Sequence, residues 1–384
     1  MTKPSKVKQT TSAKGSKRRP GIDIPKAPAA PLDTEIFADI CDQLIETIRR
    51  AQKTDRPLAV EMPYQLRVGK RDKVFVPTNF ITGDAYTGIN AQKLALVVGL
   101  KGLESGWFGT FIQWKKAGCR VKKGSKGAKC LRWLELTPEQ ARENEKLKKA
   151  GKKERHTPRP RAFTVFHASQ VEAVGELGRD VLRHIGGLKG SLVEIDRKRA
   201  LKKDHAGEPW YRLEALDRIQ LGGVKIRISS TTKEAYYTPP KHEIVMPKMV
   251  TGFRSSADYY ATLLHELVHS TWHMCGRTLG MCHESASKAM LALYFREELV
   301  AELGAWMAAA RFGLFDYTIV TTRPAGYLAH FLKHLGEKPD YLRTLLADAA
   351  RAADLVLSAA GMTVTKPAKM AWAKFFPDLL NHEG

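Results

Sequence analysis

A pentapeptide of the form His-Glu-x-x-His lies inside an apolar stretch, at His265, Glu266 and His269. On a helix, residues four apart share a face and lie about 6 Å apart, so both imidazoles can face one metal ion. Glu266 then points about 100° away and can reach water bound to that ion. Two imidazoles and an adjacent carboxylate indicate a hydrolytic zinc site with Glu266 as general base.

The residues before the pentapeptide predict the helix that this geometry needs. Residues 259–264 have the apolar density of a buried helix, and Ser255, Ser256 or Asp258 can cap its start. The alternative interpretation is two ordinary helix histidines with a salt-bridging glutamate. Because unpaired buried polar groups cost several kcal/mol, these side chains need partners, and a metal ion is one.

A third ligand is expected from a second apolar helix at about residues 285–312. That helix contains Glu297, Glu298 and Glu302, of which the last two share a face. In zincin peptidases with a glutamate ligand, the second helix carries Glu-x-x-x-Asp/Glu, where the first acid binds metal and the second orients a ligand histidine. Residues 298–302 resemble this pattern, which assigns Glu298 to the metal and Glu302 to a histidine. Glu297 or Glu302 as ligand, and a solvated acidic face, are the alternatives.

Several other side chains could contact a substrate or stabilise a transition state. They are Tyr236, Tyr237, His273 and Tyr294, and the sequence does not choose among them. His273 lies four residues after His269, so the three histidines would share one face of a helix. The rise along the helix from His265 to His273 is about 12 Å, too far for one ion to bind both.

The positive charge of the chain is concentrated in its first half. The whole chain has 63 Lys+Arg and 40 Asp+Glu, a net charge of +23. Residues 1–172 hold 35 basic and 17 acidic residues, residues 173–250 hold 15 and 10, and residues 251–384 hold 13 of each. The first half therefore suits a polyanion, and the composition excludes the acidic DNA-mimic class of restriction inhibitors.

The segment between Trp107 and Trp133 contains eight basic residues and no acid. Aromatic residues are interleaved with them or adjacent to them, at Trp107, Phe108, Phe111 and Trp114. Basic side chains can follow phosphates while aromatic faces stack on unpaired bases, which favours single-stranded DNA. The alternative is an aromatic core under an ordinary wet surface. The predicted DNA-binding residues are Trp107, Trp114, Lys115, Lys116, Arg120, Lys122, Lys123, Lys126 and Lys129.

Length and composition predict two domains in an intracellular protein. At 384 residues, each of two domains can have its own core. The five scattered cysteines form no C-x-x-C pair and indicate reduced thiols. The sequence has no apolar signal core and no run of membrane-spanning length, so we expect a cytoplasmic protein without a membrane partner.

The expected fold class is α+β. We expect a flexible basic arm at residues 1–32 and a small α+β DNA-binding domain at 33–172, with a charged insertion at about 138–161. A mainly helical, zincin-like metallopeptidase domain with a small antiparallel sheet is expected at 173–384. Helices are predicted from Asp33, near 91–100, before Gly186, near 211–219, and at 325–336 and 340–359. Strands are predicted within 74–90 and 119–136, and at 163–166, 224–228, 235–238 and 243–246, the last two as a hairpin.

Several motifs in order resemble the ArdC-like antirestriction proteins, over about residues 33–360. They are Pro77–Asn90, Gly118–Gly127, Phe163–Gln170, Ala235–Tyr237, His265–His269 and Glu297–Glu302. The resemblance implies a domain that binds single-stranded DNA followed by a zincin-like metallopeptidase domain with one zinc ion. It also implies an origin in a mobile element, a role in protecting incoming DNA from restriction, and an undefined protein substrate.

The sequence departs from that family in places. Residues 55–64 lack the tryptophans that often follow the first helix, and residues 138–161 and 281–290 alter the spacing. A second hypothesis remains beside the peptidase, namely a non-catalytic protein that coats single-stranded DNA and whose metal site is structural or vestigial. A duplex-specific transcription regulator ranks last because no helix-turn-helix is evident.

Overall fold

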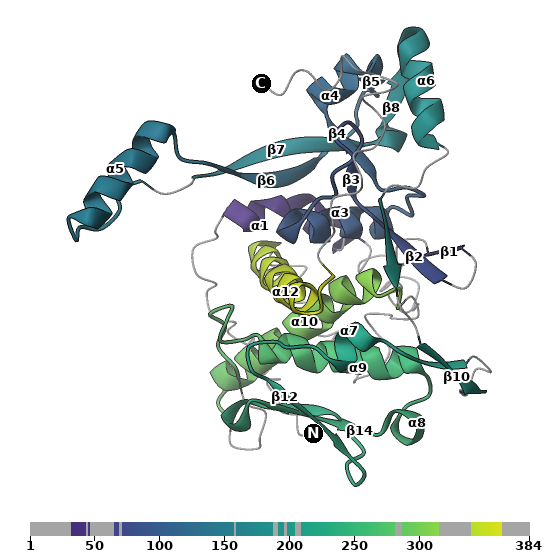
Figure 1. Ribbon diagram of the computed structural model, residues 1–384, viewed down its shortest axis with the longest axis vertical. Helices are drawn as coiled ribbons and strands as arrows, with labels where there is room; N and C mark the ends of the chain where they lie inside the picture. Colours follow the sequence, from purple (N-terminus) through teal and green to yellow (C-terminus); the bar gives the residue numbers. More distant parts are fainter. Residues whose placement is uncertain are drawn as a thin grey trace, which may run out of the picture.

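The computed structural model describes residues 32–43, 45–46, 65–68, 71–156, 159–186, 191–195, 198–203, 209–280, 286–314 and 339–362. The expected basic arm and the predicted helix at 325–336 lie outside these residues. Two domains of mixed helix and sheet are present, as the sequence predicts (Figure 1).

A four-stranded sheet organises the first domain. Its strand order is β3-β4-β7-β6, with β3 at Thr78–Asn79, β4 at Trp107–Thr110, β7 at Arg159–His167 and β6 at Ala128–Leu134. β3 runs parallel to β4, and the other pairs are antiparallel. Helices α1 (Leu32–Ile36) and α3 (Gly88–Leu100) pack beneath the sheet (Figure 1).

A smaller core lies on the other side of this sheet. It is formed with α4 (Phe111–Lys116), β5 (Cys119–Val121), β8 (Val171–Ala173) and α6 (Gly175–Gly186), and a 3-10 turn at Ala168–Gln170 precedes β8. Phe80 stacks on Trp114 at its centre, with ring centroids 3.7 Å apart. β5 pairs with β8 and not with β6, so the strands predicted within residues 119–136 join different sheets.

The remaining strands of this half form a three-stranded antiparallel sheet, β1-β2-β9. The strands span Gln65–Val68, Arg71–Val76 and Ser191–Ile195. Two elements that follow the expected division at residue 172 pack on strands of the first domain. They are β9, which pairs with β2, and α6, which packs on β8.

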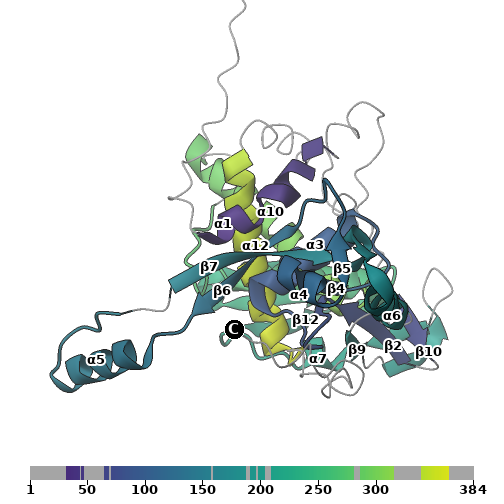
Figure 2. The same cartoon turned by 90° about the horizontal axis from the view of Figure 1, so that it is seen from above.

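The expected charged insertion forms α5 (Pro138–Lys149), at the end of the long β6–β7 ribbon. Figures 1 and 2 both show this ribbon and helix projecting away from the body of the molecule. Thr137 caps α5 and accepts a hydrogen bond from the Gln140 amide.

The second domain places a small sheet against one helix. Its strands are β12 (Lys225–Ser229), β14 (Glu243–Pro247) and β13 (Tyr236–Thr238). β13 and β14 are the predicted antiparallel hairpin, joined through a 3-10 turn at Pro239–Lys241, and β12 pairs parallel to the other edge of β14. The chain also forms β10 (Lys198–Lys203), β11 (Pro209–Arg212), α7 (Glu214–Asp217) and α8 (Met249–Gly252). Among the described residues, no helix has the length and apolar character to cross a membrane.

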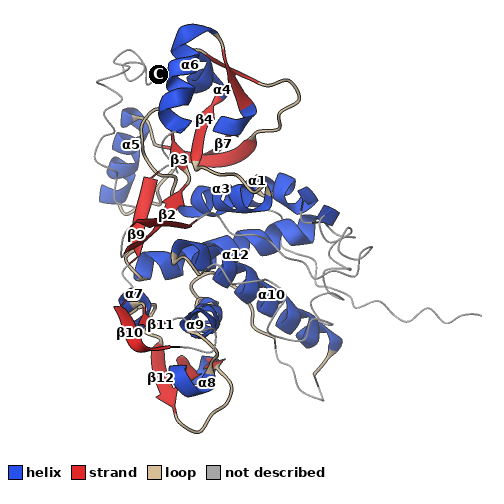
Figure 3. Cartoon of the chain, turned by 90° about the vertical axis from the view of Figure 1, so that its right-hand side faces the viewer, coloured by secondary structure: helices blue, strands red, loops and turns tan. Residues whose placement is uncertain are grey.

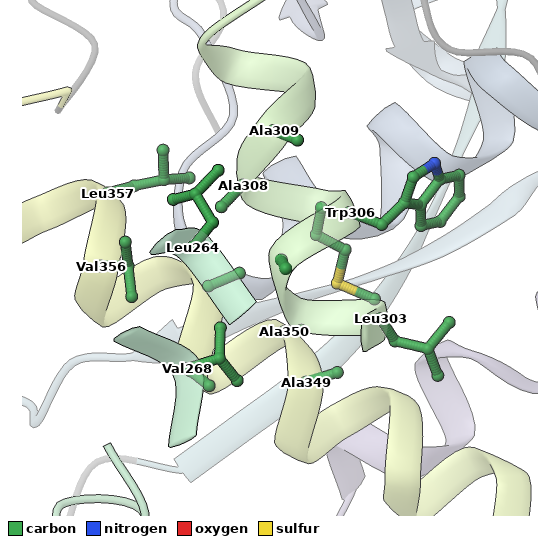
Figure 4. Close-up of a cluster of buried hydrophobic side chains, with 14 of the residues drawn as sticks. Leu264, Val268, Leu303, Trp306, Ala308, Ala309, Ala349, Ala350, Val356 and Leu357 are labelled. Carbon is green, nitrogen blue, oxygen red and sulfur yellow. The ribbon is translucent and has the colours of Figure 1, made fainter. Parts of the chain in front are cut away.

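Three long helices form the core of the second domain: α9 (Ser256–Ser270), α10 (Lys288–Arg311) and α12 (Pro339–Ala359). Figure 4 shows Leu264 and Val268 of α9 among alanines of α10 and α12. Gly304 allows this approach, because a Cβ there would lie 3.1 Å from both methyls of Val268 and 3.2 Å from the Ala349 carbonyl oxygen.

Helix α12 also packs on α3 and α1 of the first domain, as the side view in Figure 3 shows. One continuous core of buried side chains therefore extends from Phe37 of the first domain to Leu357 of the second.

Candidate metal centre

Helix α9 holds the pentapeptide in its last two turns. Ser255 caps the helix by accepting a hydrogen bond from the Asp258 amide at 3.1 Å, as one of the sequence alternatives predicts. His265 and Glu266 are only 5% and 2% exposed. Because the opposite face of the helix is fixed in the core, the direction of both imidazoles is fixed with it.

The structure brings together three side chains of types that can bind a metal, His265 and His269 from α9 and Glu298 from α10. Their ligand atoms all lie within 4.8 Å of one another. The Nε2 atoms of the two histidines are 3.1 Å apart, and the two Glu298 oxygens lie 3.5 Å from His265 Nε2 and 3.6 Å from His269 Nε2.

These distances fit a divalent cation held at a common point. Two ligands bound to tetrahedral zinc at 2.0–2.1 Å lie roughly 3.3–3.4 Å apart, close to the separations between the three side chains here. Imidazole nitrogens and a carboxylate are also the ligand set of catalytic zinc sites. The residues present therefore fit a metal ion without rearrangement of the two helices.

A second pair of carboxylates contacts the Nδ1 atoms of the two imidazoles, on the side away from Glu298. Glu302 Oε1 lies 3.4 Å from His265 Nδ1, and Glu297 Oε1 lies 3.3 Å from His269 Nδ1. A carboxylate at Nδ1 favours the tautomer with its proton there and leaves the Nε2 lone pair for a metal. Glu302 thus lies at Nδ1 of one of the two histidines, and Glu297 lies at Nδ1 of the other.

Glu297 is itself fixed by a buried arginine. Arg277 donates from Nη2 to Glu297 Oε1 at 2.8 Å and from Nε to Oε2 at 3.0 Å. It also donates to Thr271 Oγ1 and to the Val268 carbonyl of α9. Arg277 therefore ties the end of α9 to α10 at the level of His269.

The electrostatics of the centre favour positive charge between the carboxylates. Burial opposes a charged ring at His265, but Glu302 and Glu298 raise its pKa well above the ordinary value. Burial likewise opposes ionisation of Glu298, while its contact with His265 lowers its pKa to about 2. The pKa of Glu297 is also lowered, despite burial, by His269 and Arg277.

The four candidate substrate contacts lie in different settings. Tyr294 hydrogen-bonds to Glu298, which places it beside the ligand set. The Tyr237 hydroxyl lies 2.8 Å from His242 Nδ1 and accepts from Trp272 Nε1 at 3.2 Å. Tyr236 and His273 are exposed, and the His273 ring lies against His242 with centroids 5.0 Å apart.

The candidate DNA-binding residues separate into two groups. Lys115, Lys116, Arg120, Lys122, Lys123, Lys126 and Lys129 are all exposed. Trp107 and Trp114 are 1% and 0% exposed, and Trp114 donates from Nε1 to the Phe166 carbonyl. The structure therefore differs from the expectation that these tryptophans stack on bases, because both faces of each indole are covered by the core.

Sequence reasoning misses the positions of three residues at these sites. The sequence offers Glu297 only as a ligand, although a second histidine needs its own Nδ1 partner, and that requirement is the signal that points to Glu297. Arg277 lies in the segment after α9 and carries no sequence signal. Phe111 is 54% exposed beside the basic residues, so among the described residues it offers an exposed aromatic ring at that surface.

Comparisons with known proteins agree with this arrangement. Residues 34–166 match the family model described as the N-terminal domain of anti-restriction factor ArdC, and residues 214–350 match the zincin-like metallopeptidase model. The structure resembles the crystal structure of the Mn(II)-bound antirestriction ArdC protein from plasmid R388, with a TM-score of 0.50 and 26% identity. That similarity covers 84% of this chain and 98% of the other.

Relatives identified by sequence include a DNA primase TraC of Escherichia coli, 28% identical over 74% of this chain and 24% of the primase. A second is the uncharacterized protein y4eC of Sinorhizobium fredii, 27% identical over 84% of this chain and 91% of that protein. The chain thus spans about a quarter of the length of the primase it matches.

Proposed function

Since the chain belongs to the ArdC-like antirestriction family, we propose that it is a zinc-dependent metallopeptidase that also binds single-stranded DNA. Its substrate would be a protein and its location the cytoplasm of a cell receiving plasmid or phage DNA, where it would protect that DNA from restriction. The observation that carries the catalytic part is the convergence of His265, His269 and Glu298 on one point.

The proposal gives each of the chain's own residues a role. His265, His269 and Glu298 would hold one zinc ion, which supplies Lewis acidity toward water and toward a peptide carbonyl. Glu266 would accept a proton from the attacking water and pass it to the leaving amine. Glu302 and Glu297 would keep the two imidazoles oriented, and Tyr294, hydrogen-bonded to Glu298, would place a hydroxyl beside the ligand set.

The DNA-binding part rests on charge, exposure and one aromatic ring. The exposed basic residues between 115 and 129 give a surface that can follow phosphates, and the exposed Phe111 and Ile112 begin the same short helix as Lys115 and Lys116. Base stacking on an aromatic ring is worth about 1–3 kcal/mol. We therefore assign stacking to Phe111 in place of Trp107 and Trp114.

The catalytic proposal is tested with a metal analysis and a digestion. The wild type and Glu266→Gln are purified, their zinc content is measured, and each is incubated with an unstructured protein. We expect about one zinc ion per chain in both, and cleavage by the wild type alone. If both retain zinc and neither cleaves, the coating protein with a structural metal site is the better explanation.

The DNA-binding proposal is tested with a single-stranded oligonucleotide over a range of salt. The logarithm of the binding constant should fall with the logarithm of salt, by about 0.7 for each phosphate contacted. Binding that ignores salt, or no binding, would remove this part and leave the peptidase proposal intact.

A further inference from the structure

The arm formed by residues 129–164 is, apart from Lys129 at its base, a part of the molecule that neither proposed activity uses. Its ribbon pairs Lys129–Leu134 of β6 with Arg159–Thr164 of β7. β7 also pairs with β4, but only at residues 165–167. Beyond that point the ribbon is two-stranded, six residues or about 20 Å long, and it carries α5 at its end (Figure 2).

The body of the protein fixes the base of the arm. The Asn90 side chain of α3 donates to the Leu131 carbonyl at 2.6 Å and accepts from the Leu131 amide at 2.7 Å. These two hydrogen bonds satisfy the outer edge of β6 at that residue. The direction of the ribbon is therefore set by α3.

The tip of the arm is also internally fixed. Asn144 of α5 is only 7% exposed and bonds to the Arg155 amide and to both the amide and the carbonyl of His156. Glu143 pairs with the Arg155 and His156 side chains. Helix α5 is thus fastened to its own return loop, although most of its side chains are exposed.

The charge of the arm is strongly positive. Residues 129–164 contain eleven Lys and Arg against five Asp and Glu. On α5, Arg142, Lys146 and Lys149 are exposed and follow one another at spacings of four and three, so they form one stripe.

One cross-strand pair places two of these positive charges directly opposite each other in the ribbon. Ala128 and Cys130 of β6 face Val165 and Phe163 of β7 on the core side, and the next pair on that same face is Arg132 opposite Arg161. Cβ atoms opposite each other lie about 5 Å apart, and like charges there are destabilising.

Both arginines are exposed, and within the described residues no carboxylate pairs with either. The described ion pairs nearby in sequence involve other residues: Glu172 pairs with Arg120, Glu143 with Arg155 and His156, and Glu145 with Lys149. The repulsion between Arg132 and Arg161 is thus left for a partner to relieve.

We propose that the arm binds duplex nucleic acid through the Arg132–Arg161 face of its ribbon. A two-stranded ribbon fits the major groove, which is about 12 Å wide and bordered by two rows of phosphates. Two arginines side by side can contact phosphates on both rows, which would relieve the repulsion between them. The partner is a duplex because the described side chains of this face offer charge and no exposed aromatic ring for unpaired bases.

The test compares a 20-base-pair DNA duplex with a single strand of the same length, by fluorescence anisotropy over a range of salt. Arg132→Gln/Arg161→Gln should lower the duplex log–log salt slope by about 1.8, at about 0.9 per phosphate contact, which is roughly 60-fold in affinity at 0.1 M salt. Binding to the single strand should change less than twofold. The melting temperature of the variant should equal or exceed that of the wild type.

Two further variants make the result specific. Arg132→Lys/Arg161→Lys keeps both charges and should retain the wild-type salt slope. Lys233→Gln/Lys248→Gln removes two exposed charges from the metal-binding domain and should leave duplex binding unchanged. An unaltered duplex affinity in the double Gln variant of the arm, or an equal loss on single-stranded DNA, would overturn the proposal.

Discussion

The two adjacent glutamates of α10 should separate metal binding from folding stability when each is changed to glutamine. Glu298 contacts both Nε2 atoms, at 3.5 and 3.6 Å. Glu297 contacts His269 on its far side and pairs with Arg277, whose side chain is 1% exposed. The two changes are chemically identical and one residue apart, so each controls for the other.

The expected effects can be estimated for each variant. Zinc-peptide affinities of about 10–16 kcal/mol from four ligands imply roughly 2.5–4 kcal/mol per ligand, so Glu298→Gln should weaken binding by roughly 60- to 700-fold. Loss of an orienting group typically costs about 10- to 100-fold, which is the expectation for Glu297→Gln. In the metal-free protein the order of the two variants reverses: Glu297→Gln should lower the folding stability more than Glu298→Gln, because it leaves Arg277 as an unpaired buried charge. We expect about 3 kcal/mol of lost stability there, at the low end for breaking a buried pair.

Two measurements test this reversal. Zinc affinity is obtained by competition with a chelator of known affinity, and the free energy of unfolding of the metal-free protein is obtained by denaturant titration. Equal effects of the two variants on both quantities, or retention of wild-type zinc affinity by Glu298→Gln, would refute the ligand assignment.

Three further predictions follow from the same structure. His167 is buried, its Nε2 lies 2.9 Å from the Ser105 carbonyl and its Nδ1 accepts from the Ser169 amide, and burial lowers its pKa to about 4. The unfolded ring titrates near pH 6.5, so the stability that the neutral buried ring contributes is fully present above that pH. As the pH falls from 6.5 to 4, the free energy of unfolding should decrease by about 3 kcal/mol. Denaturant titrations of His167→Gln should lack this dependence. Phe111→Ala should weaken single-stranded DNA binding by about 1–3 kcal/mol in anisotropy titrations with little change in melting temperature, whereas Trp114→Ala should cost about 3–5 kcal/mol of stability. Removing the metal with a chelator should lower the melting temperature of the wild type, because a ligand that binds only the folded state stabilises it, and Glu298→Gln should show a much smaller shift.

Local sequence patterns predicted the helices well, because period and capping residues are local signals. α9 begins after Ser255, one of the three caps that the sequence offers, and α12 spans Pro339–Ala359 where residues 340–359 are expected. Partners distant in the chain were not predictable in this way. β5 pairs with β8, some fifty residues later, although a nearer strand follows it.

The candidate site shows the same division between local and non-local information. The spacing of the pentapeptide determines which two imidazoles meet, since both lie on one helix. The positions of Glu297 and Arg277 depend on how α10 crosses α9, which no spacing within either helix specifies. Composition likewise could not distinguish Trp114 from Phe111, because both lie among lysines while one is buried and the other exposed.

Helix α12 has a consequence for how the molecule can be divided. It covers α9 and α10 on one side and α3 and α1 on the other, so removing it would strip apolar surface from both domains at once. A fragment ending before Pro339 should therefore aggregate, and neither domain expressed alone should behave as an independent module. The helix also limits rotation of the basic domain relative to the metal centre, so a nucleic acid bound by the first would be presented to the second at a fixed angle.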